Sequence, residues 1–224
     1  MCIRDRYSIF DASGIMKRII LILVHSIIWR SFLRFIIGVK YVNSGVLKSQ
    51  KQFILIANHN SHLDSLAIMS AMPMSKVHRV HPIAAEDFFG DKSTKEFMMK
   101  HFVNAVLIPR RKPEKPGDPD ALQIMSDLLT KGDSIILYPE GTRGEPGVMQ
   151  DFKKGIALMV QRHPDVPVVP IFLDGLHKSM PKGVSLFLPS NSKLYVGEPV
   201  EFKSLETEDI LEDSLAAILS AKKD

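Results

Sequence analysis

Acidic residues are missing from a long stretch near the start of the chain, and cysteine is nearly missing from all of it. No Asp or Glu lies between Asp11 and Asp64, whereas seven Lys and Arg residues do. Cys2 is the single cysteine among 224 residues, which excludes an internal disulfide framework and a cysteine-based metal site and fits a reducing compartment. This basic region also carries Ile, Leu and Phe and shows no nucleic-acid-binding motif, so it indicates an anionic lipid surface as partner and no nucleic acid.

The chain also lacks a long uninterrupted apolar run. Residues 19–37 read IILILVHSIIWRSFLRFII, where no apolar run exceeds six residues. A membrane span needs roughly 20 mainly apolar residues with few charges. Ser26, Arg30 and Arg34 recur at a spacing of four, which places them in one stripe of a helix. We therefore expect residues 16–40 to form an amphipathic membrane-docking helical segment, with its arginines toward phosphate headgroups.

Other interpretations of the start of the chain remain open. The segment is also compatible with a core helix that has a solvated arginine stripe, with a spanning helix, or with a signal peptide, although no small-residue cleavage site follows it. The opening letters MCIRDR resemble a translated sequencing adaptor. We therefore expect residues 1–15 to be a non-native or disordered extension, Met16 to be the natural start, and residues 41–224 to form one domain.

Short apolar runs alternate with helical patterns through the rest of the chain. The runs that resemble buried strands are 53–57, 103–108, 134–138 and 166–173. The helical patterns include one that opens at Asp118-Pro119 and stops at Gly132, and two more at 152–162 and 209–221. Strands that alternate with helices of about ten residues predict an α/β fold with a mostly parallel central sheet flanked by helices.

The first group of chemically capable residues follows the strand at 53–57 and reads NHNSHLD. The carboxyl ends of strands are where open α/β sheets bind ligands. His59 can act there as a general base, and Asp64 can reach its other ring nitrogen and fix the tautomer. Two plainer interpretations compete with this one: Ser61 and Asp64 also match a helix capping box, and His62 can be a surface residue.

Two further groups follow strands in the same way. The segment from Pro139 to Arg143 reads PEGTR, in which glycine allows close approach of the backbone and arginine offers a bidentate fork for phosphate. The same five residues would also fit a glycine-rich turn that carries a surface salt bridge. Arg110 and Arg111 follow the strand at 103–108, where they can bind phosphate or lie in a solvated loop.

Together these groups carry a family resemblance. The chain resembles the 1-acyl-sn-glycerol-3-phosphate acyltransferases, whose first motif is His-x4-Asp and whose third is Pro-Glu-Gly-Thr-Arg, both present here. The second motif, an apolar strand that ends in arginine, matches VLIPRR with Arg110 in the motif position, and the Val-Pro-Ile segment matches the fourth. The FKKG segment at 152–155 also resembles the family pattern. The motifs stand in the family's order over about residues 58–171.

The resemblance implies a function and a role for each motif. His59 would deprotonate the free hydroxyl of a lysophospholipid, with Asp64 orienting it, and the hydroxyl would attack an acyl thioester without an acyl-enzyme. Acceptor binding is expected at five residues: Arg110, Glu140, Gly141, Thr142 and Arg143. The acyl-chain region is expected at Val169, Pro170 and Ile171. Residues 41–224 would be the acyltransferase domain. Pro109 stands where the family often has a polar residue, which leaves Arg110 or Arg111 as the phosphate ligand.

The resemblance also implies partners. The co-substrate is acyl-CoA or acyl-carrier protein, with no cofactor and no metal, and 1-acyl-sn-glycerol 3-phosphate is the expected acceptor. Another lysolipid such as a lyso-ornithine lipid is the alternative. The expected location is the cytoplasmic face of a bacterial inner membrane, as a peripheral or monotopic protein. A metal-dependent hydrolase that uses His59, His62 and Asp64 as ligands and a non-catalytic lipid-binding module remain as rivals.

Overall fold

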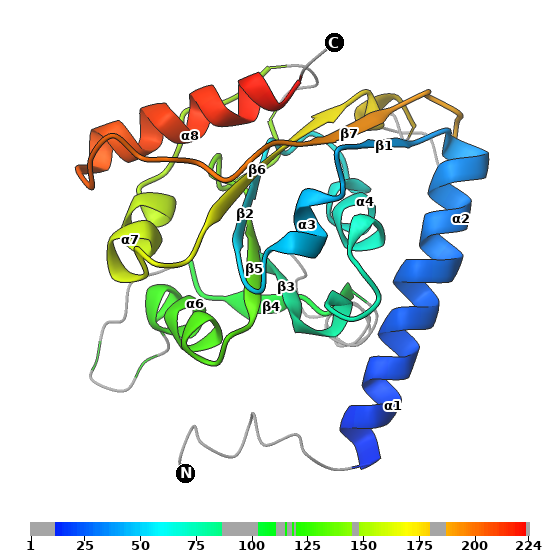
Figure 1. Cartoon of the computed structure of the whole chain (residues 1–224), viewed down its shortest axis with the longest axis horizontal. Helices are drawn as coiled ribbons and strands as arrows, with labels where there is room; N and C mark the ends of the chain where they lie inside the picture. The colour runs from blue at the N-terminus through cyan, green and yellow to red at the C-terminus, as the bar shows by residue number, and fades with distance from the viewer. Residues whose placement is uncertain are drawn as a thin grey trace.

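A seven-stranded sheet forms the centre of the domain in a computed structural model, which describes residues 12–86, 103–110, 115, 118, 120–144, 148–179 and 187–222 (Figure 1). The strands lie in the order β1-β7-β6-β2-β5-β3-β4. Their bounds are β1 (Lys40–Val42), β2 (Ile54–Ala57), β3 (Val80–Ala85), β4 (Val106–Ile108), β5 (Ser134–Leu137), β6 (Val168–Asp174) and β7 (Lys193–Val196). All neighbours pair in parallel except β6 and β7, which confirms the predicted mostly parallel sheet.

Helices cover both faces of the sheet. On one face lie α3 (Val46–Ser49), α4 (Asp64–Ala71) and the helix at the start of the chain, and on the other lie α6 (Ala121–Thr130), α7 (Gly155–Arg162) and α8 (Thr207–Ala221) (Figure 1). Every residue of β2 and β5 is buried, and successive apolar residues of each strand pack into the hydrophobic core on opposite faces of the sheet. This explains why both read as continuous apolar runs in the sequence.

All three predicted helix starts differ from the observed ones, and α8 begins two residues before the predicted start, at Thr207. Helix α6 begins after Asp120, whose carboxylate accepts from the Leu122 amide at 3.1 Å, so Asp120 and not Asp118 is the N-cap. Asp118 accepts from the Lys115 amide in the preceding loop instead. Helix α7 begins at Gly155, the last residue of the FKKG segment, which leaves Lys153 and Lys154 just before its N-terminal end. The short 3-10 helices η4 (Val77–Arg79) and η7 (Leu176–Ser179) complete the described elements.

One continuous helix runs over Ala12–Ile37, and we call it the N-terminal helix. It comprises α1 (Ala12–Leu21), η2 (Ile22–Trp29), α2 (Arg30–Phe32) and η3 (Leu33–Ile37), and it ends at Gly38 in the left-handed region. It begins before Met16, and residues 1–11 lie outside the described part. Its Gly14–Ile37 portion is long and apolar enough to cross a membrane by length and composition.

The N-terminal helix buries one face against α4 and leaves the other exposed. The predicted single polar stripe is wrong, because Ser26 is buried among the packed residues whereas Arg34 is exposed. Spacing alone placed them together, but contact with α4 determines which face turns inward. The exposed face carries eight large apolar side chains: Ile15, Met16, Ile19, Leu23, Ile27, Ile28, Phe35 and Ile36.

Candidate active site

His59 lies in the loop between β2 and α4, at the carboxyl edge of the sheet, and Asp64 lies where this loop enters α4. Asn58 fixes the start of this loop, since its side chain donates to the Leu173 carbonyl at 2.9 Å and accepts from the Leu173 amide at 2.7 Å. Helix α4 then begins at Asp64 itself. The loop is therefore attached to β6 at one end and to α4 at the other, which gives His59 a defined backbone position.

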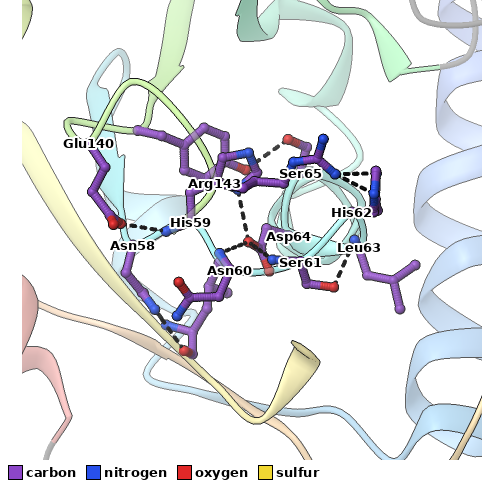
Figure 2. A network of polar contacts seen from close by, with 12 residues as sticks. Asn58, His59, Asn60, Ser61, His62, Leu63, Asp64, Ser65, Glu140 and Arg143 are labelled. Carbon is purple, nitrogen blue, oxygen red and sulfur yellow. Dashed lines mark hydrogen bonds and ion pairs between the residues drawn. The ribbon is translucent and has the colours of Figure 1, made fainter. Parts of the chain in front are cut away.

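The Asp64 carboxylate joins both predicted roles in one oxygen atom. Asp64 is 1% exposed, and its Oδ2 accepts from the Asn60 and Ser61 amides at 2.8 Å each (Figure 2). The same Oδ2 lies 2.9 Å from Nδ1 of His59. Because a carboxylate only accepts, Nδ1 of a neutral His59 carries the proton and Nε2 is left as the basic nitrogen. One carboxylate oxygen thus both accepts from the backbone amides before α4 and contacts the His59 ring, so the capping and catalytic interpretations are compatible with each other.

Glu140 fastens the PEGTR loop to the backbone of His59. It is fully buried, with Oε1 accepting from the His59 amide at 2.8 Å and Oε2 accepting from the Gln150 amide at 2.9 Å. The Gly144 amide donates to the His59 carbonyl at 3.1 Å. Both backbone groups of His59 are thereby bonded to one loop. Glu140 was expected to contact the acceptor, but the structure places it behind His59, where it supports the backbone.

Tyr138 and His62 are two site residues that the motifs did not identify. Tyr138 directly follows β5, and its ring stacks on the His59 imidazole with centroids 3.9 Å apart and planes 17° apart. His62 lies beside Arg143, whose Nη1 is 2.6 Å from His62 Nδ1 (Figure 2). In the sequence, Tyr138 could have been noticed only as an aromatic residue that stands between an apolar strand and the PEGTR segment.

Burial and neighbouring charges hold His62 in its neutral form. Burial is the largest cause that lowers the pKa of His62, followed by Arg143 and His59, while Asp64 raises it. A neutral imidazole can accept a hydrogen bond from the guanidinium, whereas an imidazolium would repel it. His62 and Arg143 therefore form a compatible pair near neutral pH.

A cavity of about 1040 Å³ opens beside His59. Its polar lining includes His59, His62, Arg110, Thr142, Arg143 and Lys153, and Gly141 contributes backbone in the left-handed region. Its apolar lining includes Ile83, Ile108, Leu122 and Met125 from β3, β4 and α6, with further apolar residues from α4, β5 and α7. The structure thus brings four of the predicted acceptor-binding residues to one cavity with His59, while Asp64 lies buried behind the His59 ring. Arg111 lies outside the described residues.

The Val-Pro-Ile segment, which was predicted as the acyl-chain region, lies outside this cavity. Val169, Pro170 and Ile171 belong to β6, where they pair with Leu55, Ile56 and Ala57 of β2. All three are buried in the sheet, and none is among the residues that line the cavity. Their placement supports β2 directly beneath the His59 loop. The apolar lining of the cavity includes residues of β3, β4 and α6 instead.

The described residues do not support the metal-dependent rival. Among them, no group of three or more His, Cys, Asp or Glu side chains is placed to hold a metal ion. His59 and Asp64 bond to each other, and His62 turns to Arg143. The site therefore has the arrangement of a base with its orienting carboxylate beside a basic, partly apolar cavity.

Comparison with known proteins agrees with this arrangement. The family model described as Acyltransferase matches residues 38–174, more than half of the chain. The chain is 26% identical over 201 residues to human 1-acyl-sn-glycerol-3-phosphate acyltransferase alpha, covering 87% of this chain and 64% of that protein. It is 36% identical over 95 residues to the chloroplastic 1-acyl-sn-glycerol-3-phosphate acyltransferase LPAT1 of Arabidopsis thaliana, covering 42% and 26%.

The fold also matches a solved structure. The 1-acyl-sn-glycerophosphate acyltransferase PlsC from Thermotoga maritima aligns with a TM-score of 0.69 at 23% identity, over 98% of this chain and 85% of that one. The chain spans slightly less than two thirds of the length of the curated mammalian relatives it matches. The order of the motifs, the geometry of the site and the family match agree, and the chain belongs to the acyltransferase family.

Proposed function

We propose that this protein transfers an acyl chain from an acyl thioester to the free hydroxyl of a lysophospholipid. The carrier of the thioester is acyl-CoA or acyl-carrier protein, and the acceptor of first choice is 1-acyl-sn-glycerol 3-phosphate, which would give phosphatidic acid. One observation carries the proposal: the His59–Asp64 pair, 2.9 Å apart, opens onto a cavity that combines basic side chains with an apolar wall.

The chemistry follows from the protonation of His59. Nε2 takes the proton of the acceptor hydroxyl while the hydroxyl oxygen attacks the thioester carbonyl carbon. Asp64, whose Oδ2 accepts a hydrogen bond from Nδ1–H, stabilises the imidazolium that forms. The tetrahedral intermediate collapses with cleavage of the C–S bond, and the leaving sulfur takes the proton back from Nε2. The products are an ester and a free thiol, and the transfer is direct.

The basic side chains suit a phosphate headgroup. Arg143 presents a planar fork that matches two phosphate oxygens, and His62 lies against it as a second polar contact. Arg110 lines the same cavity from the end of β4. A phosphate held by these groups would leave the glycerol hydroxyl toward His59 and the acyl chains toward the apolar wall. A lyso-ornithine lipid, which lacks phosphate, would use the arginines less.

The N-terminal helix suggests how such a site meets its lipid. Its exposed apolar face includes Phe35 and Ile28, which are 77% and 61% exposed, with Arg18 and Arg34 also exposed on the helix. Apolar insertion and attraction to anionic headgroups reinforce each other at a bilayer surface. We propose that this helix docks the domain on the cytoplasmic face of a bacterial inner membrane, where acyl thioesters are made.

The experiment is a panel of lysolipid acceptors, each offered with acyl-CoA and with acyl-carrier protein, and read by mass spectrometry of the products. The proposal predicts phosphatidic acid from lysophosphatidic acid with at least one donor. Hydrolysis of the thioester with no acylated lipid from any acceptor would refute it. Preference for a phosphate-free lysolipid would keep the reaction and replace the acceptor.

A further inference from the structure

We propose that Tyr138 is a positioning residue for His59, holding the imidazole so that Nδ1 stays on Asp64 and Nε2 faces the cavity. The inference rests on the proposed function, because it assigns Tyr138 an effect on the proton transfer by His59. The site motifs do not include Tyr138, since it precedes PEGTR. Its contacts assign the role.

Tyr138 is fixed at both of its ends. Its backbone directly follows β5, the neighbour of β2 in the sheet, so it projects from the strand beside the His59 loop. Its hydroxyl lies 2.8 Å from Oγ of Ser65, in the first turn of α4. The ring therefore spans from β5 to the helix that begins at Asp64, with the His59 imidazole stacked on it.

His59 needs this second restraint because the bond to Asp64 leaves one motion open. A hydrogen bond at Nδ1 fixes one edge of the ring but permits the plane to turn about the line from Nδ1 to Oδ2. The imidazole is 20% exposed beside the cavity, so the surrounding protein does not enclose it fully. A stacked ring 3.9 Å away fixes the plane. The two contacts together determine the direction of Nε2.

The Tyr138 hydroxyl acts here as an anchor and stays protonated. Burial is the main cause that raises the pKa of Tyr138 well above its ordinary value, and the charge of Asp64 raises it further. The hydrogen bond with Ser65 acts in the opposite direction. A hydroxyl in this state stays protonated near neutral pH and is not a base, and its bond to Ser65 holds the ring in place.

The chain offers a matched tyrosine as control. Tyr41, on β1, places its hydroxyl 2.7 Å from Oγ of Ser70, which lies on the same helix α4. It repeats the tyrosine–serine bond to α4, but it does not line the cavity and no stack with His59 is found for it. Substitution of Tyr41 therefore reports what loss of a tyrosine anchor on α4 does without touching His59.

The test compares Tyr138→Leu, Tyr138→Phe and Tyr41→Leu by kcat and by KM for lysophosphatidic acid. An aromatic pair of this kind corresponds to about 2- to 12-fold in rate. Tyr138→Leu should lower kcat by about that factor with little change in KM, whereas Tyr138→Phe, which keeps the stack and loses only the hydroxyl anchor, should lower kcat less. Tyr41→Leu should leave kcat unchanged. Equal losses of kcat in Tyr138→Leu and Tyr41→Leu would overturn the proposal.

A double substitution tests whether Tyr138 acts through His59. In a His59→Ala background, Tyr138→Leu should cause no further loss of the residual rate, whereas the same fold-loss in both backgrounds would show a separate structural role. If circular dichroism shows that Tyr138→Leu does not fold, Tyr138→Met fills the space with a flexible side chain and is held to the same predictions. A wild-type protein inactive on every acceptor refutes the proposed function, whereas an active wild type with an unaffected Tyr138→Leu refutes the role of Tyr138 alone.

Discussion

Asp64→Asn separates the two roles that one carboxylate oxygen combines. Oδ2 of Asp64 accepts from His59 and from the Asn60 and Ser61 amides, and its other oxygen is buried without a hydrogen bond among the described residues. Asparagine can place its single oxygen where Oδ2 lies and keep the amide bonds. Its NH2 group then occupies a buried position without an acceptor, and the negative charge opposite His59 is gone.

The expected loss of rate follows from these contacts. A hydrogen bond to a charged group contributes about 1.5–3 kcal/mol, which corresponds to about 10- to 150-fold in rate if the contact stabilises the imidazolium in the transition state. If the asparagine amide is flipped, its NH2 group faces Nδ1 of His59, and the ring proton then lies on Nε2. A protonated Nε2 cannot accept the proton of the acceptor hydroxyl. We therefore expect kcat to fall by about 10²- to 10⁴-fold, in the range of general-base catalysis.

The assay is acylation of lysophosphatidic acid at saturating donor, together with thermal unfolding of the same preparations. Asp64→Asn should unfold within a few degrees of the wild type, since the two backbone amides keep an acceptor. Ser61→Ala is the control, because it removes only the Oγ that accepts from the Leu63 amide. A folded Asp64→Asn variant with near-wild-type kcat would refute the catalytic role of Asp64 and leave capping as its function.

Three further predictions test the acceptor site, the membrane helix and the effect of pH. Arg143→Ala should raise KM for lysophosphatidic acid about 10- to 150-fold and Arg143→Lys should restore only part, whereas equal losses on a phosphate-free acceptor would make Arg143 structural. Ile28→Asp with Phe35→Asp should reduce liposome flotation at every salt concentration, whereas Arg34→Glu should weaken it mainly at low salt; unchanged flotation of both would show that the helix is not the anchor. Burial first, then Arg18 and Arg79, lower the pKa of His78. As the pH falls below about 6.5, His78 of the unfolded chain therefore takes up a proton that the folded state disfavours, so the free energy of unfolding decreases as the pH decreases. His78→Gln should flatten the dependence of Tm on pH between pH 7 and 5, and an unchanged dependence would contradict this.

The sequence was most informative where interactions are local. His59 and Asp64 are five residues apart, and a strand that passes into a helix brings them together whatever the rest of the chain does. The strands β2 and β5 were visible as well, because burial on both faces leaves a continuous apolar run. The short strands β1 and β7 lack that signal, since they hold three and four residues and each includes an exposed lysine.

Interactions that depend on the order of the strands were not visible. Tyr138 and Glu140 are about 80 residues from His59 in the chain, and they reach it because β2 and β5 are neighbours in the sheet. In the sequence, a glutamate in a glycine-rich loop suggests contact with a ligand, but in the fold the Glu140 carboxylate accepts from the His59 backbone amide. Burial of Ser26 likewise depends on where α4 packs, which no spacing in residues 19–37 encodes.

The turnover of a His59→Ala variant tests the central claim most directly. His163→Ala is its matched control, because His163 bonds to Ser126 between α6 and α7 and does not line the cavity. With lysophosphatidic acid and the preferred donor, His59→Ala should lose about 10²- to 10⁴-fold in kcat while remaining folded, and His163→Ala should keep wild-type turnover. A folded His59→Ala variant that forms phosphatidic acid at the wild-type rate would contradict the account.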